Sequence, residues 1–144
     1  MNEFIPKFLD ISDWELRIYQ NTTGTRSKRI TINPATHEEY FLKGSKELET
    51  GEIRYPTEFW SEIVSSKIGQ ILGFNMLDYN IAYHASWKQK IGCLSKSMVT
   101  TGENKLTEGK VYLTGHDIKY NPEKDGGKYT FSFIRSAFET FQLN

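Results

Sequence analysis

The sequence predicts an α+β fold: an antiparallel sheet of about five strands, one long helix packed on it, and a C-terminal helix. Three observations predict this fold. Short runs before residue 44 alternate apolar and polar residues, as half-buried strands do. Residues 57–72 and 129–142 repeat apolar residues at the spacing of one helix face. Two further strand-like runs, residues 77–83 and 90–99, follow the first of these helices.

Three strands are expected before the long helix. Trp14, Leu16 and Ile18 alternate with polar residues, and residues 29–32 and 39–43 repeat the alternation. Polar turns that contain glycine, asparagine or proline separate these runs. The three strands therefore form a meander of two successive hairpins.

The long helix is expected over residues 57–72. Thr57 is a suitable N-cap, and Gly73 is a suitable residue just after the last turn. Glu62 lies opposite the apolar stripe, near Ser66 and Gly69, whose small side chains would allow a sheet to approach closely. The apolar residues form one broad stripe: Phe59, Trp60, Ile63, Val64, Ile68 and Ile71.

The chain is expected to form a single domain over residues 1–144. Its sheet and long helix occupy residues 10–99, and residues 100–144 hold a connecting region and the terminal helix. A chain of 144 residues supports one core but is too short for a two-lobed enzyme. No internal repeat or linker indicates a second domain.

Composition excludes several function classes. Eighteen basic and eighteen acidic residues cancel, so no net field attracts nucleic acid or an acidic membrane. No leader-like or bilayer-length apolar segment is present, and a lone Cys93 suits a buried position in a reducing compartment. We therefore expect a cytoplasmic location. His37, His84 and His116 are dispersed, so no metal site is expected.

Lys43 and Glu62 are the first candidate site residues. Lys43 ends the third strand on the same face as Phe41, where it can neutralise phosphate oxygens while Phe41 lines a base pocket. Glu62 lies on the next helix and can hold the lysine in place. Taken singly, a solvated lysine and a solvated glutamate are the commoner interpretation. Their occurrence together in this strand order favours a phosphate site.

The turn between the first two strands is a second candidate. Its sequence is Gly24-Thr25-Arg26-Ser27-Lys28. Backbone N–H groups in such a turn can cradle phosphate, and the two basic residues add charge. The turn has neither three spaced glycines nor a Walker motif, so an ordinary hairpin tip with solvated bases is the alternative.

Five short motifs follow one another along the chain. They are residues 24–28, Phe41-Leu42-Lys43, residues 55–62, Ile71-Leu72-Gly73 and residues 92–97. In this order and spacing they resemble the small lobe of HipA-like serine/threonine kinases, in the short form without the extra N-terminal subdomain. The resemblance covers roughly residues 14–99, and it implies a kinase small-lobe fold.

The resemblance also implies a function and roles for particular residues. Lys43 would contact the phosphates of ATP, Glu62 would hold Lys43, and the turn from Gly24 to Lys28 would cover the phosphates. Ser95, Lys96 and Ser97 would form the hinge that reads adenine through backbone groups. A protein substrate and an antitoxin-like DNA-binding partner, as in toxin–antitoxin systems, are implied as partners.

The catalytic half of a kinase is not expected in this chain. Phosphoryl transfer needs an aspartate base, an asparagine and a second aspartate that holds magnesium. Asp117 and Asn121 have the wrong spacing for these roles and are expected to lie in a loop. We therefore expect ATP and Mg²⁺ as cofactors, with the magnesium ligands outside this chain, which is then a fragment or a truncated product. The alternatives are a non-catalytic regulatory or interaction module with the same fold, and an unrelated α+β interaction domain.

Overall fold

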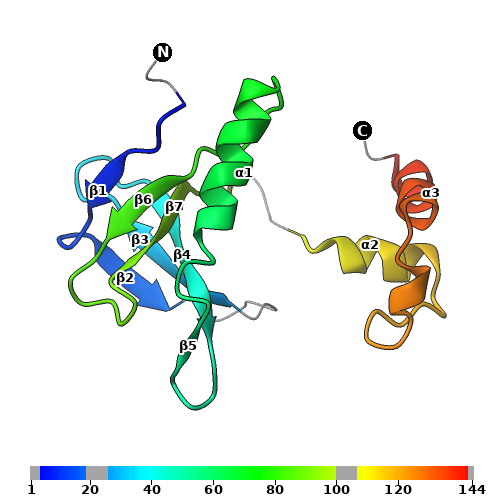
Figure 1. Ribbon diagram of the computed structural model, residues 1–144. Coiled ribbons are helices and arrows are strands. Elements are labelled where there is room, and N and C mark those ends of the chain that lie inside the picture. Colours follow the sequence, from blue (N-terminus) through cyan, green and yellow to red (C-terminus); the bar gives the residue numbers. More distant parts are fainter. Residues whose placement is uncertain (1–3, 19–25, 100–106, 143–144) are drawn as a thin grey trace. The chain divides into compact units, whose positions relative to one another are not determined.

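The computed structural model describes residues 4–18, 26–99 and 107–142 of the chain. The chain forms two compact units, Met1–Met98 and Val99–Asn144. The first unit contains strands β1 to β7 and helix α1 (Trp60–Ile71) (Figure 1). The second unit contains α2 (Gly109–His116), the short 3₁₀ helix η1 (Gly126–Lys128) and α3 (Phe131–Phe141). The boundary between the two units lies at residue 99, which is also where the part of the sequence predicted to form the sheet and the long helix ends.

A curled mixed sheet forms most of the first unit (Figure 1). The strands run in the order β1-β6-β7-β4-β3-β2, and β5 pairs with β4. β1 pairs with β6 in parallel and the other pairings are antiparallel. The strands are β1 (Phe8–Asp10), β2 (Glu15–Ile18), β3 (Arg26–Ile32), β4 (Glu39–Glu47), β5 (Ile53–Arg54), β6 (Asn80–Tyr83) and β7 (Ile91–Lys96).

The α+β class is as predicted, but the sheet differs from five antiparallel strands. The three predicted strands of the meander are β2, β3 and β4, and the two later runs contain β6 and β7. β1 and β5 are additional, with three and two residues. Runs this short do not display a period of two, so a sequence pattern cannot reveal them.

The sheet buries side chains on both faces. On the helix face, which carries Cys93 and Ile81, Ile63 of α1 and the preceding residue Phe59 pack against the sheet. The far face carries a separate core, formed by the buried residues Ile11, Leu42, Ala82, Trp87 and Leu94. Because successive strand residues point to opposite faces, Lys43 lies on the helix face and its neighbour Leu42 on the far face.

Helix α1 (Trp60–Ile71) begins later than predicted. Thr57 is not its N-cap, because the chain still turns there and the Thr57 carbonyl accepts a hydrogen bond from the Trp60 N–H at 3.1 Å. Phe59 occupies the cap position without a side-chain cap bond. Gly73 has φ +81°, the left-handed conformation expected of a glycine after a helix.

Most residues of the predicted apolar stripe lie outside the face through which α1 packs on the rest of the first unit. Ile63 is buried, but Trp60, Val64 and Ile71 are 40%, 50% and 63% exposed. The buried residues of the helix are instead Ile63, Ser66, Lys67 and Gly69. The small residues allow close packing: the Ser66 hydroxyl donates to the Leu77 carbonyl, and a Cβ on Gly69 would lie 2.5 Å from the Met76 side chain. Close approach and a backbone hydrogen bond therefore decide which face packs.

The second unit is a small helical cluster. It consists of α2 (Gly109–His116), η1 (Gly126–Lys128) and α3 (Phe131–Phe141), around a core of Leu113, Tyr120 and Ala137. α3 matches the predicted terminal helix, and the Thr130 hydroxyl caps it by accepting the Phe133 N–H at 3.3 Å. α2 was not predicted, because its eight residues show little apolar periodicity. None of the helices within the described ranges is long and apolar enough to cross a membrane.

Candidate functional site

Lys43 and Glu62 approach one another on the helix face. Lys43 lies on β4, where its direct cross-strand partners are Lys28 on β3 and Cys93 on β7. The Lys43 Nζ atom lies 3.8 Å from the Glu62 Oε2 atom on α1. The two side chains are 21% and 29% exposed, so the ion pair is partly buried. The predicted approach of these two residues within ion-pair distance is confirmed.

Tyr79 is a third member of the site, and it was not predicted from the sequence. The Lys43 ammonium donates a hydrogen bond to the Tyr79 hydroxyl and lies 4.8 Å from the centroid of its ring. The ring is buried with Phe59, Ile63 and Cys93, which fixes the hydroxyl in position. The available signal was that Tyr79 alternates with Ile81. Ile81 pairs with Cys93 and Cys93 pairs with Lys43, so β7 lies between them, and the sequence alone does not reveal this order of strands.

Positive charge is concentrated beside this group. Lys28 and Lys43 are direct partners on neighbouring strands, so their side chains leave the same face of the sheet. Like charges in this arrangement repel and destabilise the pairing. Glu62 supplies one negative charge next to Lys43. An anion next to these two residues would relieve the repulsion between their charges.

Phe41 and Ser95 extend the site along the helix face. They are direct cross-strand partners, two residues from Lys43 and Cys93 respectively, and therefore point to the same side. Ser95 is 1% exposed, and its hydroxyl has no hydrogen-bond partner among the described residues. A buried hydroxyl without a partner is uncommon in folded proteins. The side chains next to Lys43 on this face are therefore the aromatic ring of Phe41 and the buried Ser95 hydroxyl.

Lys96 and Ser97, the rest of the predicted hinge, have other contacts. The Lys96 ammonium forms an ion pair with Glu38, and this hydrogen bond raises the pKa of Lys96. As the cross-strand partner of Tyr40, Lys96 points to the far face, away from Lys43. The Ser97 N–H donates to the Glu39 carbonyl at 2.8 Å, so this donor is already used within the sheet.

The predicted phosphate-covering turn lies only partly within the described residues. Gly24 and Thr25 are outside them, and β3 already begins at Arg26. Ser27 and Lys28 therefore belong to a strand and not to the turn, which corrects the expectation for them. A register irregularity between Arg26 and Lys28 lets the strand continue through this polar stretch.

His84 and Cys93 are buried and contact neighbouring parts of the first unit. The His84 ring accepts a hydrogen bond from the Ser86 N–H, and its other nitrogen lies 3.1 Å from the Trp14 carbonyl. Cys93 is buried in the core under α1. In residues 4–18, 26–99 and 107–142, no three His, Cys, Asp or Glu side chains are grouped so that they could hold a metal ion.

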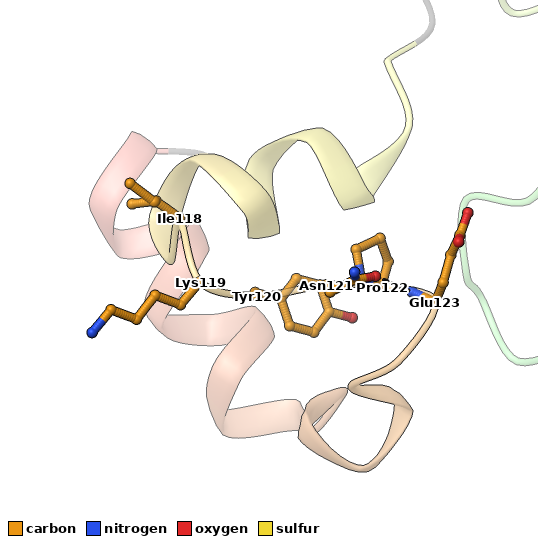
Figure 2. A pocket seen from close by; sticks show the side chains of 6 residues that line it. All are labelled: Ile118, Lys119, Tyr120, Asn121, Pro122 and Glu123. Carbon is orange, nitrogen blue, oxygen red and sulfur yellow. Dashed lines mark hydrogen bonds between the residues drawn. The ribbon is translucent and has the colours of Figure 1, made fainter.

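Asp117 and Asn121 serve turns in the second unit. The Asp117 carboxylate accepts the Lys119 N–H at 2.9 Å, and the Asn121 side chain accepts the Glu123 N–H at 3.0 Å. An open hollow of about 510 Å³ lies along this loop and is lined by residues 118–123 alone (Figure 2). These residues come from one stretch of chain, so no group from a second element faces them across the hollow.

No protein-family model, no curated protein and no solved structure matches this chain.

Proposed function

We propose that the helix face binds the phosphates of ATP, in the manner of the small lobe of a HipA-like serine/threonine kinase. The Lys43–Glu62 ion pair, 3.8 Å long, carries the proposal. In protein kinases a lysine of the small-lobe sheet contacts the phosphates and a glutamate of the neighbouring helix holds it. Here the lysine lies in the third strand of a meander and the glutamate in the helix that follows.

Partial burial of the pair supports a functional role. Exposed ion pairs contribute little to stability, typically about 0–1 kcal/mol, and removing charges from water has a cost. Lys43 also carries a hydrogen bond to the fixed Tyr79 hydroxyl. A lysine held from two sides is positioned for a third contact, which a phosphate oxygen would supply.

The neighbouring residues supply the rest of a nucleotide site. Lys28 brings a second cation next to Lys43, and a polyphosphate would relieve the repulsion between them. Phe41 offers an apolar surface to a base, and Ser95 lies beside it on β7 with a buried hydroxyl that has no hydrogen-bond partner among the described residues. Phe41 and Ser95 lie on the same face of the sheet as Lys43. The base of ATP could therefore lie against Phe41 while its phosphates contact Lys43.

ATP binding and phosphoryl transfer are separate parts of the proposal. The helix face supplies phosphate contacts, whereas a base and the magnesium ligands belong to the large lobe of a kinase. We propose that such a lobe completes the enzyme and that its residues would hold Mg²⁺, which would neutralise charge on the phosphates. A protein hydroxyl as acceptor and an antitoxin-like DNA-binding partner belong to the same proposal.

A titration with ATP and Mg²⁺ tests nucleotide binding, observed through backbone amide shifts of the whole chain. We expect shifts at Lys28, Phe41 and Ser95, with a dissociation constant in the millimolar range, equivalent to about 4 kcal/mol. The affinity is expected to be low because one face of the base stays in water. Lys43→Met should abolish these shifts without unfolding the chain.

Lys124→Met is the matched control, because it makes the same chemical change in the second unit. It should leave the titration unchanged. Shifts confined to other surfaces, or binding that Lys43→Met does not weaken, would show that the helix face is not the nucleotide site.

A further inference from the structure

The far face of the sheet has a cavity of its own. Its volume is about 470 Å³, within the range of small-molecule sites, and residues of β1, β4, β6 and β7 line it. Tyr40 and Lys96 are cross-strand partners in its wall, as are Asn80 and Leu94. The cavity lies on the opposite side of the sheet from Lys43, so it is independent of the proposed nucleotide site.

The walls of this cavity favour a flat, apolar group. The rings of Trp14 and Tyr40 contact each other with centroids 5.0 Å apart and planes inclined at 59°. Leu9 and Leu94 add aliphatic surface, and Leu94 is almost fully buried in the far-face core. Aromatic rings prefer offset or edge-to-face packing, so a ligand ring that enters the cavity would pack against Trp14 or Tyr40 in one of these ways.

The polar rim has one uncompensated positive charge. The ammonium of Lys96 is paired with Glu38. Asp78 is paired with Lys67. Burial by itself would raise the pKa of Asp78, but hydrogen bonds from Lys67, Asn80 and Gln70 together lower it.

Lys7 is the remaining charged residue of the lining. Its backbone N–H donates to the Asn80 side chain at 2.8 Å, which fixes the position of the chain at the rim. Among the described residues no carboxylate pairs with its ammonium group. An anionic group at this end of the cavity would be attracted to the Lys7 ammonium. The acidic residue of the described lining, Asp78, is already paired with Lys67.

We propose that the far-face cavity binds a small planar aromatic acid, with its ring against Trp14 and Tyr40 and its carboxylate at Lys7. The aromatic walls select the ring, and the free ammonium selects the charge. This site would act separately from nucleotide binding on the helix face, and either site could be present without the other.

Two probes with the same ring and opposite charge test this proposal. Indole-3-acetate and tryptamine are titrated into the whole chain in separate experiments, and backbone amide shifts are followed. We expect indole-3-acetate to shift Leu9, Tyr40 and Leu94 in the millimolar range, and tryptamine to bind more weakly. Lys7→Gln should weaken indole-3-acetate about fivefold, the effect of losing one partly exposed charge pair.

Lys124→Gln in the second unit is the control and should leave the affinity unchanged. Lys7 is exposed and its backbone hydrogen bond does not depend on the side chain, so Lys7→Gln should fold normally. Equal binding of the two probes, no shifts on the far face, or an affinity unaffected by Lys7→Gln would each overturn the proposal. Shifts at Val64 and Ile68 would assign the ring to the exposed side of α1, and shifts at Phe41 and Ser95 to the helix face; both would also overturn it.

Discussion

The Tyr79 hydroxyl accepts a hydrogen bond from the Lys43 ammonium, which also lies 3.8 Å from the Glu62 carboxylate. The three groups come from different parts of the chain: Lys43 from strand β4, Tyr79 from the segment just before β6, and Glu62 from helix α1. The lysine is therefore held by a neutral acceptor on one side and an anion on the other. This restricts its side chain before any ligand arrives, which reduces the entropic cost of binding.

Tyr79→Phe should destabilise the first unit by about 1–2 kcal/mol, because it removes a hydrogen bond to a charged group and leaves the ring in place. Urea unfolding followed by tryptophan fluorescence measures this change, since Trp14, Trp60 and Trp87 all lie in the first unit. Tyr83→Phe is the control: this half-buried residue of β6 should change stability by less than about 0.5 kcal/mol. Equal effects of the two substitutions would contradict the role of the Tyr79 hydroxyl.

The Lys43–Glu62 pair should show a small but measurable coupling energy. A double-mutant cycle with Lys43→Met, Glu62→Gln and both together isolates it. We expect about 0.5–1 kcal/mol at low salt, because the groups are 3.8 Å apart and partly exposed. The coupling should decrease in 1 M salt, where the screening length is about 3 Å. Strictly additive effects would mean that the two charges do not interact in solution.

The Lys43–Glu62 approach was predictable because it depends on local patterns. The period of two assigns Lys43 to a strand, the period of 3.6 assigns Glu62 to a helix, and the helix follows the strand closely in sequence. Tyr79 was not predictable in this way. Its contact with Lys43 depends on β7 lying between β4 and β6, and no local pattern fixes that order.

The packing face of α1 shows where hydrophobicity fails as a guide. Apolar residues such as Val64 and Ile71 predict one face, and the structure packs another, through Ile63, Ser66 and Gly69. The Ser66 hydroxyl satisfies a backbone carbonyl, and Gly69 has no Cβ to hold the helix away. Such contacts depend on the partner segment, so they cannot be read from the periodicity of the helix alone.

Gly92 should be intolerant of any side chain. A Cβ at this position would lie 2.4 Å from the Lys43 carbonyl oxygen and 2.8 Å from the Trp87 ring. Since backbone cannot move aside at small cost, Gly92→Ala should destabilise the first unit by about 2–3 kcal/mol. Tryptophan fluorescence during urea unfolding measures the loss.

Gly109→Ala is the matched comparison for Gly92→Ala. A Cβ on Gly109 meets no atom within 4 Å, and the residue begins α2 in the second unit. Unfolding of the first unit should therefore be unchanged by this substitution. A Gly92→Ala variant as stable as the parent chain would show that β4 and β7 are not packed as closely as the structure has them.

The chain alone should transfer no phosphate. Phosphoryl transfer depends on positioning and on charge stabilisation by magnesium and a base-bearing loop, and in the proposed site Lys43 and Glu62 would supply only the phosphate contacts. Asp117 and Asn121 are engaged in turns of the second unit. When the purified chain is incubated with labelled ATP, Mg²⁺ and a generic protein acceptor, neither the chain nor the acceptor should become labelled. Labelling that Asp117→Asn abolishes would identify that carboxylate as the base and overturn the expectation. Labelling that survives both Asp117→Asn and Lys43→Met would instead indicate a contaminating kinase, which Lys43→Met is included to detect.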